Sequence, residues 1–364
     1  MSRCIAVALS GGVDSLVAGF LLKQKTDRVV GIHFTTGFEQ ADPDDSSGKN
    51  VPGSNLTHTL LDHLKHQLNI DVIHIDCKDA FRRLVVDYFI QTYQSGQTPN
   101  PCLVCNPLIK FGVIRNAASK LGAEELATGH YARTAMDPDG QYHLLTGVDP
   151  QKDQSYFLSR MTQNNLKSAM FPLGTLTKSR VREIAAENSL IPFSRNESQD
   201  VCFIKNMNYA DFISRQGEIQ PEPGLIVDVQ GRVLGKHSGL HRFTVGQRRG
   251  INVPAANPYY VVRLDAQANR LIVGWKEELA VSECRVTHIN WIEHIPSGPI
   301  EISVRLRYRH QATPALLIPE SGHTSVRVCF EKPQAAVTPG QGAVFYQGEV
   351  VLGGGFISSD FQAS

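Results

Sequence analysis

Apolar runs and amphipathic stretches alternate along the first 207 residues. Runs of strand length occupy residues 5–9, 29–34, 72–75 and 125–128, and helical periods occupy residues 16–22, 56–68, 81–93, 108–121 and 154–190. This alternation predicts an α/β domain with a doubly wound parallel sheet and helices on both faces. Ligands then bind beyond the carboxyl ends of the strands. The polar segment 39–53 is predicted to be a mobile loop and a candidate lid.

The pattern changes after residue 216. Glycine and proline become frequent, and short strand-like runs replace the helical periods. These runs cover residues 225–229, 259–264, 271–273, 300–308, 325–330 and 342–345. We therefore expect three domains: an α/β domain over residues 1–208, a small central β-rich domain over 209–278 and a C-terminal β-barrel over 279–364.

The composition is that of an ordinary folded protein. The chain has 364 residues, 41% of them hydrophobic and 20% charged, and a formal net charge of +1. The small charge argues against bulk binding to polyanions but leaves room for a local basic surface. No apolar stretch approaches the roughly 18 residues that span a bilayer, and no secretory leader is recognisable. The seven scattered cysteines lack the pattern of a secreted disulfide framework, so we expect a cytoplasmic protein.

The first apolar run leads into a glycine turn, Ser-Gly-Gly-Val-Asp-Ser at residues 10–15, and then into a helical stretch. A strand, turn and helix in this order aim the unpaired N–H groups of the first helical turn at one point, where the helix dipole favours a phosphate. The glycines allow a close approach, the serines add hydroxyl donors, and Asp14 can hold a magnesium ion or cap the helix. The turn lacks the Gly-Lys-Ser/Thr ending of a Walker A element. A plain turn rich in small residues is the alternative.

Three cysteines stand in surroundings that suggest chemistry. Cys102 and Cys105 form a Cys-x-x-Cys pair between prolines, and Cys202 follows a polar run at the end of the α/β region. Two thiols so spaced can share a metal ion, exchange a disulfide, or combine a nucleophile with a resolving group. The remaining cysteines are interpreted as small buried hydrophobic residues; they are Cys4, Cys77, Cys284 and Cys329.

Several motifs carry a resemblance to a known family. The turn at residues 8–15 resembles the pyrophosphate loop of the ATP pyrophosphatase superfamily, whose members split ATP between its α- and β-phosphates and adenylate a carbonyl oxygen. Further motifs lie at residues 98–101, 105–112, 127–132, 152–158, 244–250 and 336–341. Together they make nearly the whole chain similar to the bacterial tRNA-specific 2-thiouridylases. That family replaces the C2 oxygen of the wobble uridine of tRNA with sulfur.

The resemblance implies roles for individual residues. It assigns ATP binding, with Mg²⁺, to Ala8, Leu9, Ser10, Gly11, Gly12, Val13, Asp14 and Ser15, with Phe34 and Gly129 near the adenine. Cys105 corresponds to the catalytic nucleophile, and Cys202 to the cysteine that receives a persulfide from a sulfur-donor protein. The implied reaction is adenylation of the C2 oxygen, attack of persulfide sulfur at C2 and loss of AMP. Cys105 then resolves the persulfide and leaves a disulfide with Cys202.

Cys102 departs from the family pattern, because many members have Asp at this position. The chain therefore has three thiols where two are usual: Cys102, Cys105 and Cys202. Three cysteines can bind a [4Fe-4S] cluster and leave one iron open to hydrosulfide. A cluster-bound hydrosulfide and a persulfide are both kept here as hypotheses for the sulfur source.

The resemblance also implies contacts with tRNA. The corresponding residues are Asn100, Pro101 and Cys102 near a flipped base, and His130, Lys152, Asp153, Gln154, Arg307, Tyr308 and Gln341 elsewhere. The uridine has to leave its stack because its C2 otherwise lies inside the anticodon loop. Independently, Arg305, Arg307 and Arg309 alternate in a strand-like run and are predicted to share one face for phosphates. A solvated charged edge strand is the alternative.

Two other classes of function fit part of the pattern. An amidating ligase, such as an argininosuccinate or GMP synthetase, uses the same loop but needs no paired thiols. A zinc-stabilised RNA-binding module would use Cys102 and Cys105 as structural ligands and would not turn over ATP. No long exposed apolar helix demands a protein partner, so we expect a monomer that meets tRNA and a persulfide-carrying donor protein.

Overall fold

A computed structural model describes residues 4–26, 28–39, 53–193, 201–204, 207–217, 221–320 and 322–360. The candidate lid at 39–53 falls almost entirely outside the described residues, as does the polar run before Cys202. Contacts divide the chain into two compact units. The first comprises Met1–Val85, Cys102–Lys205 and Glu349–Val351, and the second comprises Val86–Pro101, Asn206–Gly348 and Leu352–Ser364.

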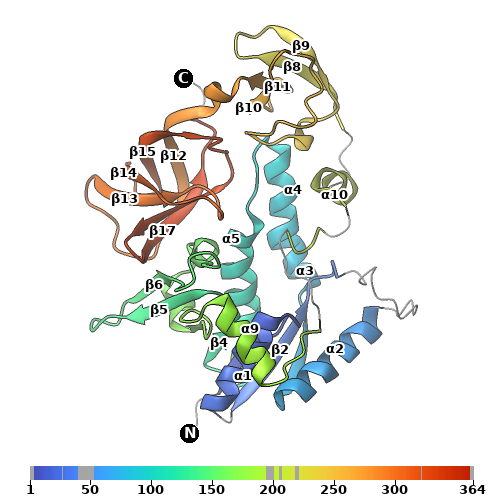
Figure 1. Cartoon of the computed structure of the whole chain (residues 1–364), viewed down its shortest axis with the longest axis vertical. Helices are drawn as coiled ribbons and strands as arrows, with labels where there is room; N and C mark the ends of the chain where they lie inside the picture. Colours follow the sequence, from blue (N-terminus) through green and yellow to red (C-terminus); the bar gives the residue numbers. More distant parts are fainter. Residues whose placement is uncertain are drawn as a thin grey trace. The chain divides into compact units, whose positions relative to one another are not determined.

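A five-stranded parallel sheet forms the centre of the first unit (Figure 1). Its order is β3-β2-β1-β4-β7, with β1 at Ile5–Ala8, β2 at Val29–Thr35, β3 at Asp71–Asp76, β4 at Glu125–Ala127 and β7 at Ala169–Met170. The chain order reverses between β1 and β4, so the carboxyl ends of these two strands flank a topological switch point. The predicted doubly wound parallel sheet is confirmed.

Helices cover this sheet. Helices α1 (Val13–Lys25), α2 (Gly53–Leu68) and α9 (Lys178–Glu187) share an apolar core with alternate residues of β1, such as Ile5 and Val7. All four residues of β1 are buried, as expected for a strand that is covered on both faces. Helix α6 (Arg115–Lys120) contacts β4. The same unit contains the short helices α3 (Lys78–Phe81), α7 (Ser155–Leu158) and α8 (Gln163–Lys167) and the hairpin of β5 (Ala132–Met136) and β6 (Tyr142–Thr146).

Two helical segments depart from the predicted α-helical period. The predicted helix at 81–93 contains a π-helix, η1 (Arg82–Val86), before α4 (Asp87–Gln94). The predicted helix at 108–121 begins as the π-helix η2 (Asn106–Ile114), which continues α5 (Pro101–Cys105) and leads into α6. Pro107 has no N–H to donate, and a side chain at Gly112 would bring its Cβ within 3.1 Å of the Pro107 carbonyl oxygen. These residues favour the wider turn, which is often found at functional sites.

The second unit begins with α4 and α10 (Tyr209–Gln216), whose aromatic side chains stack at Tyr93 and Tyr209 with ring centroids 5.1 Å apart. A four-stranded sheet follows in the order β10-β11-β8-β9. Its strands are β8 (Gly224–Asp228), β9 (Val233–His237), β10 (Tyr260–Asp265) and β11 (Arg270–Gly274), with the 3-10 turns η3 (Leu240–Arg242) and η4 (Lys276–Leu279). Its small core includes Ile226, Phe243 and Val261.

The last six strands close into a barrel (Figure 1). Their order is β12-β15-β14-β13-β16-β17, and β17 pairs with β12 to complete the circle. They are β12 (Ala280–Trp291), β13 (Ile300–Arg305), β14 (Thr313–Pro319), β15 (Ser325–Ala335), β16 (Gly342–Gln347) and β17 (Val350–Ile357). At the seam Gly353 has φ +154°, and a Cβ there would collide with the Asn290 carbonyl oxygen. The predicted C-terminal β-barrel is confirmed.

Candidate active site

The glycine turn lies between β1 and α1, at the switch point. Gly11 has φ +86°, a conformation that favours glycine, and Gly12 precedes α1 without any side-chain cap. The Ser15 hydroxyl donates to the Gly12 carbonyl at 2.9 Å, and the Ser10 backbone N–H donates to the Ser15 oxygen at 3.2 Å. The serines therefore close the turn on itself. Because no side chain of the described residues caps α1, its first N–H groups can receive an anion.

Asp14 neither caps the helix nor stands alone. Its carboxylate accepts hydrogen bonds from the Lys178 ammonium at 2.8 Å to each oxygen, and from the Tyr131 hydroxyl at 2.7 Å. The side chain of Lys178 is 7% exposed and that of Asp14 is 34% exposed. Lys178 is the first residue of α9, so three distant segments place a compensated pair of charges beside the glycine turn.

The end of β4 approaches the same turn. A Cβ on Gly129 would lie 2.9 Å from the Asp14 carbonyl carbon and 3.0 Å from the Ser15 nitrogen, so only glycine fits without a shift. Phe34, near the end of β2, is half-buried. Its neighbour His33 bonds the Leu9 carbonyl through Nδ1 at 2.8 Å, and burial lowers the pKa of His33. The structure thus brings the turn and Gly129 together.

The cysteines of interest belong to the first unit. Cys102 and Cys105 lie in α5 and are half-buried, whereas Cys202 is exposed. Burial raises the pKa of Cys102 to about 11 and that of Cys105 to about 12. The charge of Cys202 contributes to both increases, and the positive charge of Lys110 opposes both. The three predicted thiols are therefore close enough to interact electrostatically, with a lysine among them.

A buried histidine holds that lysine. The Lys110 Nζ lies 3.2 Å from His130 Nε2, and His130 Nδ1 lies 2.6 Å from the Thr128 hydroxyl oxygen. His130 is 7% exposed, and the ring of Phe171 packs edge-on against it with centroids 6.0 Å apart. Burial first, and then the charge of Lys110, lowers the pKa of His130 well below its ordinary value. The imidazole is accordingly neutral.

Metal ligation was predicted as one use of the thiols. Within the described ranges, which include all three cysteines, no group of three His, Cys, Asp or Glu side chains is placed to hold a metal ion. The thiol chemistry suits an iron–sulfur cluster, in which each cysteine binds a different iron, so the cluster stays a prediction.

The predicted tRNA-contact run Lys152-Asp153-Gln154 divides by burial. Asp153 is 2% exposed and accepts hydrogen bonds from the backbone N–H groups of Gly147 and Ser155 at 2.9 and 3.1 Å. Gln154 accepts the Tyr131 N–H at 3.0 Å through its side-chain oxygen. Lys152 is half-buried. Asp153 and Gln154 thus fix the local backbone.

Two other predicted contact residues meet in the second unit. The Asn100 side-chain amide donates to the Gln341 side-chain oxygen at 3.3 Å, and the Gln341 amide donates to the Pro99 carbonyl at 3.2 Å. Gly340, with φ +86°, lies against Thr98, where a Cβ would approach the Thr98 carbonyl oxygen to 2.8 Å. Segment 98–101 is therefore fastened to the turn before β16.

The predicted arginine face is wrong. Strand β13 ends at Arg305, and residues 307–309 lie in a bend and turn, so the three arginines do not alternate on one strand. Arg305 stacks over the Tyr346 ring at 4.9 Å. The Arg307 guanidinium donates to the Ala336 carbonyl at 2.9 Å and to the Thr338 hydroxyl at 2.5 Å. These bonds turn the chain out of the sheet. Tyr308, beside Arg307, is half-buried.

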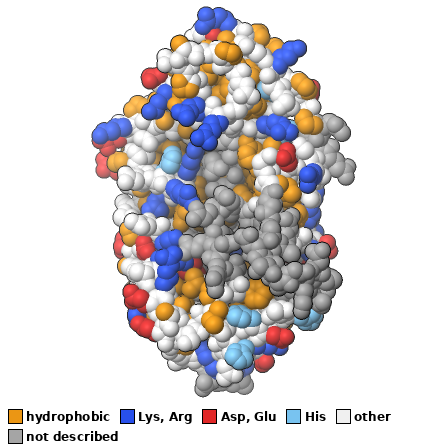
Figure 2. All heavy atoms as spheres, turned by 45° about the vertical axis from the view of Figure 1, so that its right-hand side comes forward, with side chains coloured by type: hydrophobic (Ala, Val, Ile, Leu, Met, Phe, Trp, Pro, Cys, Tyr) orange, Lys and Arg blue, Asp and Glu red, His pale blue; other side chains and the backbone are white. Residues whose placement is uncertain are grey.

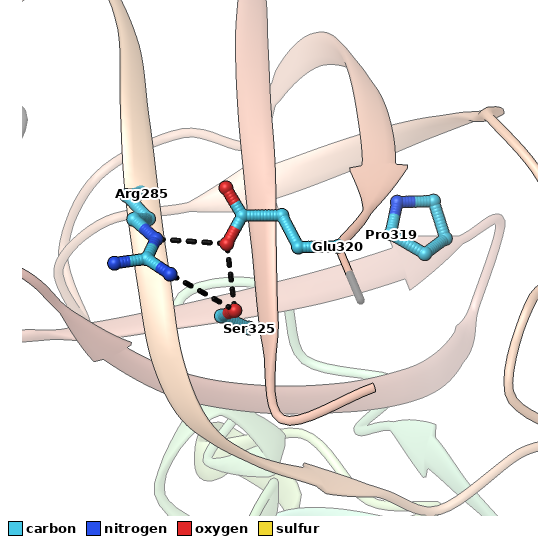
Figure 3. A pocket seen from close by; sticks show the side chains of 4 residues that line it. All are labelled: Arg285, Pro319, Glu320 and Ser325. Carbon is cyan, nitrogen blue, oxygen red and sulfur yellow. Dashed lines mark hydrogen bonds and ion pairs between the residues drawn. The ribbon is translucent and has the colours of Figure 1, made fainter. Parts of the chain in front are cut away.

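On the face that Figure 2 shows, Lys and Arg side chains lie in several groups, with hydrophobic side chains between some of them. Figure 3 shows a hollow on the barrel lined by Arg285, Pro319, Glu320 and Ser325. Glu320 accepts from Arg285 at 2.8 Å and from Ser325 at 2.6 Å, so these polar groups satisfy one another. None of the predicted site residues lines this hollow. Within the described ranges no helix is both long and apolar enough to cross a bilayer.

Sequence reasoning missed three site residues: Lys178, Tyr131 and Lys110. Lys178 did carry a signal, because Lys178, Arg180 and Arg182 begin a predicted helix, where positive charge opposes the helix dipole. Tyr131 and Lys110 belong to motifs that pointed to the family, but nothing local in the sequence indicates their partners.

A glycine turn at the switch point of a parallel sheet places the first unit among α/β domains of nucleotide-binding type. Family models agree: residues 3–206 match a tRNA methyl transferase HUP domain, residues 210–275 a tRNA methyl transferase PRC-barrel domain, and residues 281–357 an aminomethyltransferase beta-barrel domain.

Curated relatives identify the family within this class of nucleotide-binding proteins. The chain is 51% identical to tRNA-specific 2-thiouridylase MnmA of Desulfosudis oleivorans, over 98% of this chain and 95% of the relative. It is 43% identical to MnmA of Trichlorobacter lovleyi, over 99% and 98%. It is 41% identical to MnmA of Geotalea uraniireducens, over 97% and 94%. The chain therefore belongs to the tRNA-specific 2-thiouridylase family.

Proposed function

We propose that this chain is a tRNA-uridine 2-sulfurtransferase that uses ATP to replace the C2 oxygen of the wobble uridine with sulfur. Full-length similarity to tRNA-specific 2-thiouridylases supports the activity. The observation that carries the proposal is the first unit itself, which contains both a phosphate-type glycine turn and three interacting thiols. An amidating ligase needs only the first of these features.

The glycine turn serves the ATP half-reaction. Residues 8–15 bind the phosphates with Mg²⁺, and Phe34 and Gly129 border the adenine. The Lys178 ammonium lies beside the turn and is held there by Asp14 at 2.8 Å. Added phosphate charge gives Lys178 a second anionic partner. Lys178 thus stabilises the negative charge that develops when pyrophosphate leaves and the uridine oxygen becomes adenylated.

The thiols serve the sulfur half-reaction. Cys202 is exposed, so a donor protein can deliver a persulfide to it. The terminal persulfide sulfur attacks C2, the C–O bond breaks and AMP leaves with the oxygen. The Cys105 thiolate then attacks the Cys202 sulfur, which releases the thiolated uridine and forms a Cys105–Cys202 disulfide. An external thiol reductant reopens that disulfide for the next turnover.

The proposed reaction uses no iron–sulfur cluster. The exposed Cys202 can accept a persulfide without a cluster, and no step is assigned to a cluster. Cys102 instead adds a third thiol beside the uridine. Iron and acid-labile sulfide analysis after anaerobic purification tests this choice, with an active, iron-free protein as the expected result.

The remaining roles concern tRNA, domain limits and location. tRNA contacts are assigned to Asn100, Pro101, Cys102, Lys152, Arg307, Tyr308 and Gln341, with Asp153 and Gln154 shaping the backbone next to Lys152. The domain limits 1–208, 209–278 and 279–364 are supported by the breaks between the family-model matches at 206–210 and 275–281. We place the protein in the cytoplasm as a monomer.

The test combines ATP, an unmodified tRNA with a wobble uridine, a persulfide-carrying donor protein and a thiol reductant. AMP and 2-thiouridine are both measured by mass spectrometry. Cys105→Ser and Cys202→Ser are expected to lower thiolation by at least about 10³-fold. In a single turnover without the reductant, which would cleave the product, Cys105→Ser should also trap tRNA on Cys202 as a mixed disulfide. Cys329→Ser, on the barrel, is the matched control and is expected to retain full activity.

Each alternative has its own outcome. AMP formation without thiolation, with Cys105→Ser behaving like the parent, would indicate an amidating ligase. Absence of AMP together with unfolding by a chelator would indicate a zinc-stabilised RNA-binding module.

A further inference from the structure

The π-helix η2 sets the position of Lys110 relative to the thiols. Cys105 precedes η2 in a helical conformation, and Lys110 follows five residues later. In a π-helix the bonds run from residue i to i+5, as from the Lys110 carbonyl to the Arg115 N–H, so residues five apart lie one turn apart. In an α-helix the same two side chains would point in different directions. The wider turn thus brings Lys110 to the side of Cys105.

The hydrogen-bond partner of Lys110 is the neutral ring of His130 at 3.2 Å, and within the described ranges no carboxylate forms an ion pair with this lysine. An ammonium group only donates, so His130 Nε2 has to accept. His130 Nδ1 then carries the proton and donates to the Thr128 hydroxyl at 2.6 Å. The chain of bonds fixes Lys110 and, among the described residues, leaves its charge without a carboxylate partner.

His130 has no capacity left for a ligand. Both ring nitrogens are used, and the side chain is 7% exposed. The direct contact with tRNA that the family resemblance implies for His130 stays a prediction. With both nitrogens engaged, His130 also suits a residue that acts through Lys110.

We propose that Lys110, positioned by His130 and Thr128, forms an anion site beside Cys105 and Cys102, and that its ligand is anionic sulfur: a thiolate or persulfide of these cysteines or of Cys202. This inference rests on the proposed function, because that reaction produces such anions here. Lys110 lowers the pKa of both Cys102 and Cys105, in agreement with a position next to their sulfur atoms. The site gives negative sulfur a fixed partner in surroundings that otherwise disfavour charge.

The test compares two alkylating agents on the full-length protein. Iodoacetate is an anion and iodoacetamide is neutral, and both react with the same thiolate. The ratio of their rates at Cys105, followed by peptide mass spectrometry at one pH, reports local charge and cancels the thiolate fraction. Lys110→Met is expected to lower this ratio about fivefold or more. Lys110→Arg should keep most of it, since the positive charge remains.

Lys120→Met is the matched control. Lys120 is exposed in α6, and this change removes one positive charge elsewhere in the same unit. The ratio of iodoacetate to iodoacetamide rates at Cys105 in Lys120→Met is expected to equal that of the parent protein. An unchanged ratio in Lys110→Met, or an equal fall in Lys120→Met, would overturn the proposal.

Two further measurements distinguish an anion site for sulfur from a phosphate site and define the part that His130 plays in it. Binding of a non-hydrolysable ATP analogue should be unchanged in Lys110→Met; a tenfold loss there would show that Lys110 serves phosphate instead. His130→Gln retains an acceptor and a donor and should keep the ratio within twofold of the parent, whereas His130→Leu should lower it as Lys110→Met does. The alkylation assay needs neither tRNA nor ATP turnover, so it can fail or succeed independently of the proposed thiolation.

Discussion

Two lysines in the first unit differ in what balances their charge. Lys178 donates to both oxygens of Asp14 at 2.8 Å, whereas Lys110 meets the neutral imidazole of His130 at 3.2 Å. The first lysine has its counter-ion in place. The second is held without a counter-ion in the part of the chain that the structure describes. The comparison suggests a division of labour, with a compensated lysine at the ATP turn and an uncompensated lysine where sulfur becomes anionic.

The short segment after β4 connects these two environments. A Cβ on Gly129 would collide with the Asp14 backbone, and the Tyr131 hydroxyl donates to the Asp14 carboxylate at 2.7 Å. Thr128 bonds His130, and His130 in turn bonds Lys110. One four-residue stretch therefore contacts both Asp14 and Lys110 and can support both half-reactions.

Among the variants that test this comparison of two lysines, the largest expected effect falls on the ATP half-reaction alone. Lys178→Met removes the cation beside the glycine turn and leaves Asp14 unbalanced, so AMP formation should fall by about 10²- to 10³-fold. The iodoacetate-to-iodoacetamide ratio at Cys105 should not change. Rapid-quench measurement of AMP and the alkylation assay on the same protein check both statements.

Lys178→Arg is the control for charge, and circular dichroism checks that each variant is folded. Because Asp14 is 34% exposed, we expect the free energy of unfolding to fall by only about 1 kcal/mol in Lys178→Met. Equal falls in AMP formation and in the alkylation ratio at Cys105 would mean that the two lysines are not functionally separate.

The sequence predicted those features of the first unit that depend on a local pattern of residues. The apolar runs gave four of the five strands of the parallel sheet, β1, β2, β3 and β4, because buried strands leave a continuous signal. The glycine turn was also predicted, because its residues are contiguous in the sequence. The partners of Asp14 were not, since Tyr131 and Lys178 are 117 and 164 residues away and only the folded sheet brings them together.

Other errors also have local causes. The apolar period at 108–121 indicated an α-helix, but its first part is π-helical, and that change places Lys110 beside Cys105. The alternating arginines at 305–309 looked like a strand, yet Arg307 satisfies the Ala336 carbonyl and Thr338 and ends the strand early. Hydrophobic period does not report which polar side chains will find backbone partners.

A smaller effect concerns the free energy of unfolding at acid pH. Burial lowers the pKa of His130 well below the unfolded value of about 6.5, so the folded state binds fewer protons than the unfolded state below that pH. The contribution of neutral His130 to the free energy of unfolding is therefore complete above pH 6.5. It is lost as the pH falls toward the lowered pKa of the folded state. Urea unfolding of the parent at pH 7.5, 6.0 and 5.0 should show decreasing stability, with up to about 1.4 kcal/mol per pH unit from this group.

His130→Gln isolates that share, because burial also lowers the pKa values of His33, His237, His241 and His310. Glutamine can accept from Lys110 and donate to Thr128 but does not titrate in this range. The variant should lose less stability between pH 6.5 and 5.0 than the parent. Parallel curves would show that His130 is not held neutral beside Lys110, and the contrast between the two lysines would lose its basis.

The smallest expected effect comes from Thr128, which is one hydrogen bond further from the cysteine sulfur atoms than His130. Thr128→Val removes the acceptor of the His130 Nδ1–H bond at 2.6 Å, so the imidazole can adopt the tautomer whose Nε2–H cannot accept from Lys110. The alkylation ratio at Cys105 should fall about twofold, a fraction of the loss in Lys110→Met, and AMP formation should be unchanged. Thr128→Ser keeps the hydroxyl and should match the parent. A fall in AMP formation of similar size would show instead that the segment after β4 transmits changes to the glycine turn, so that the two half-reactions share one support.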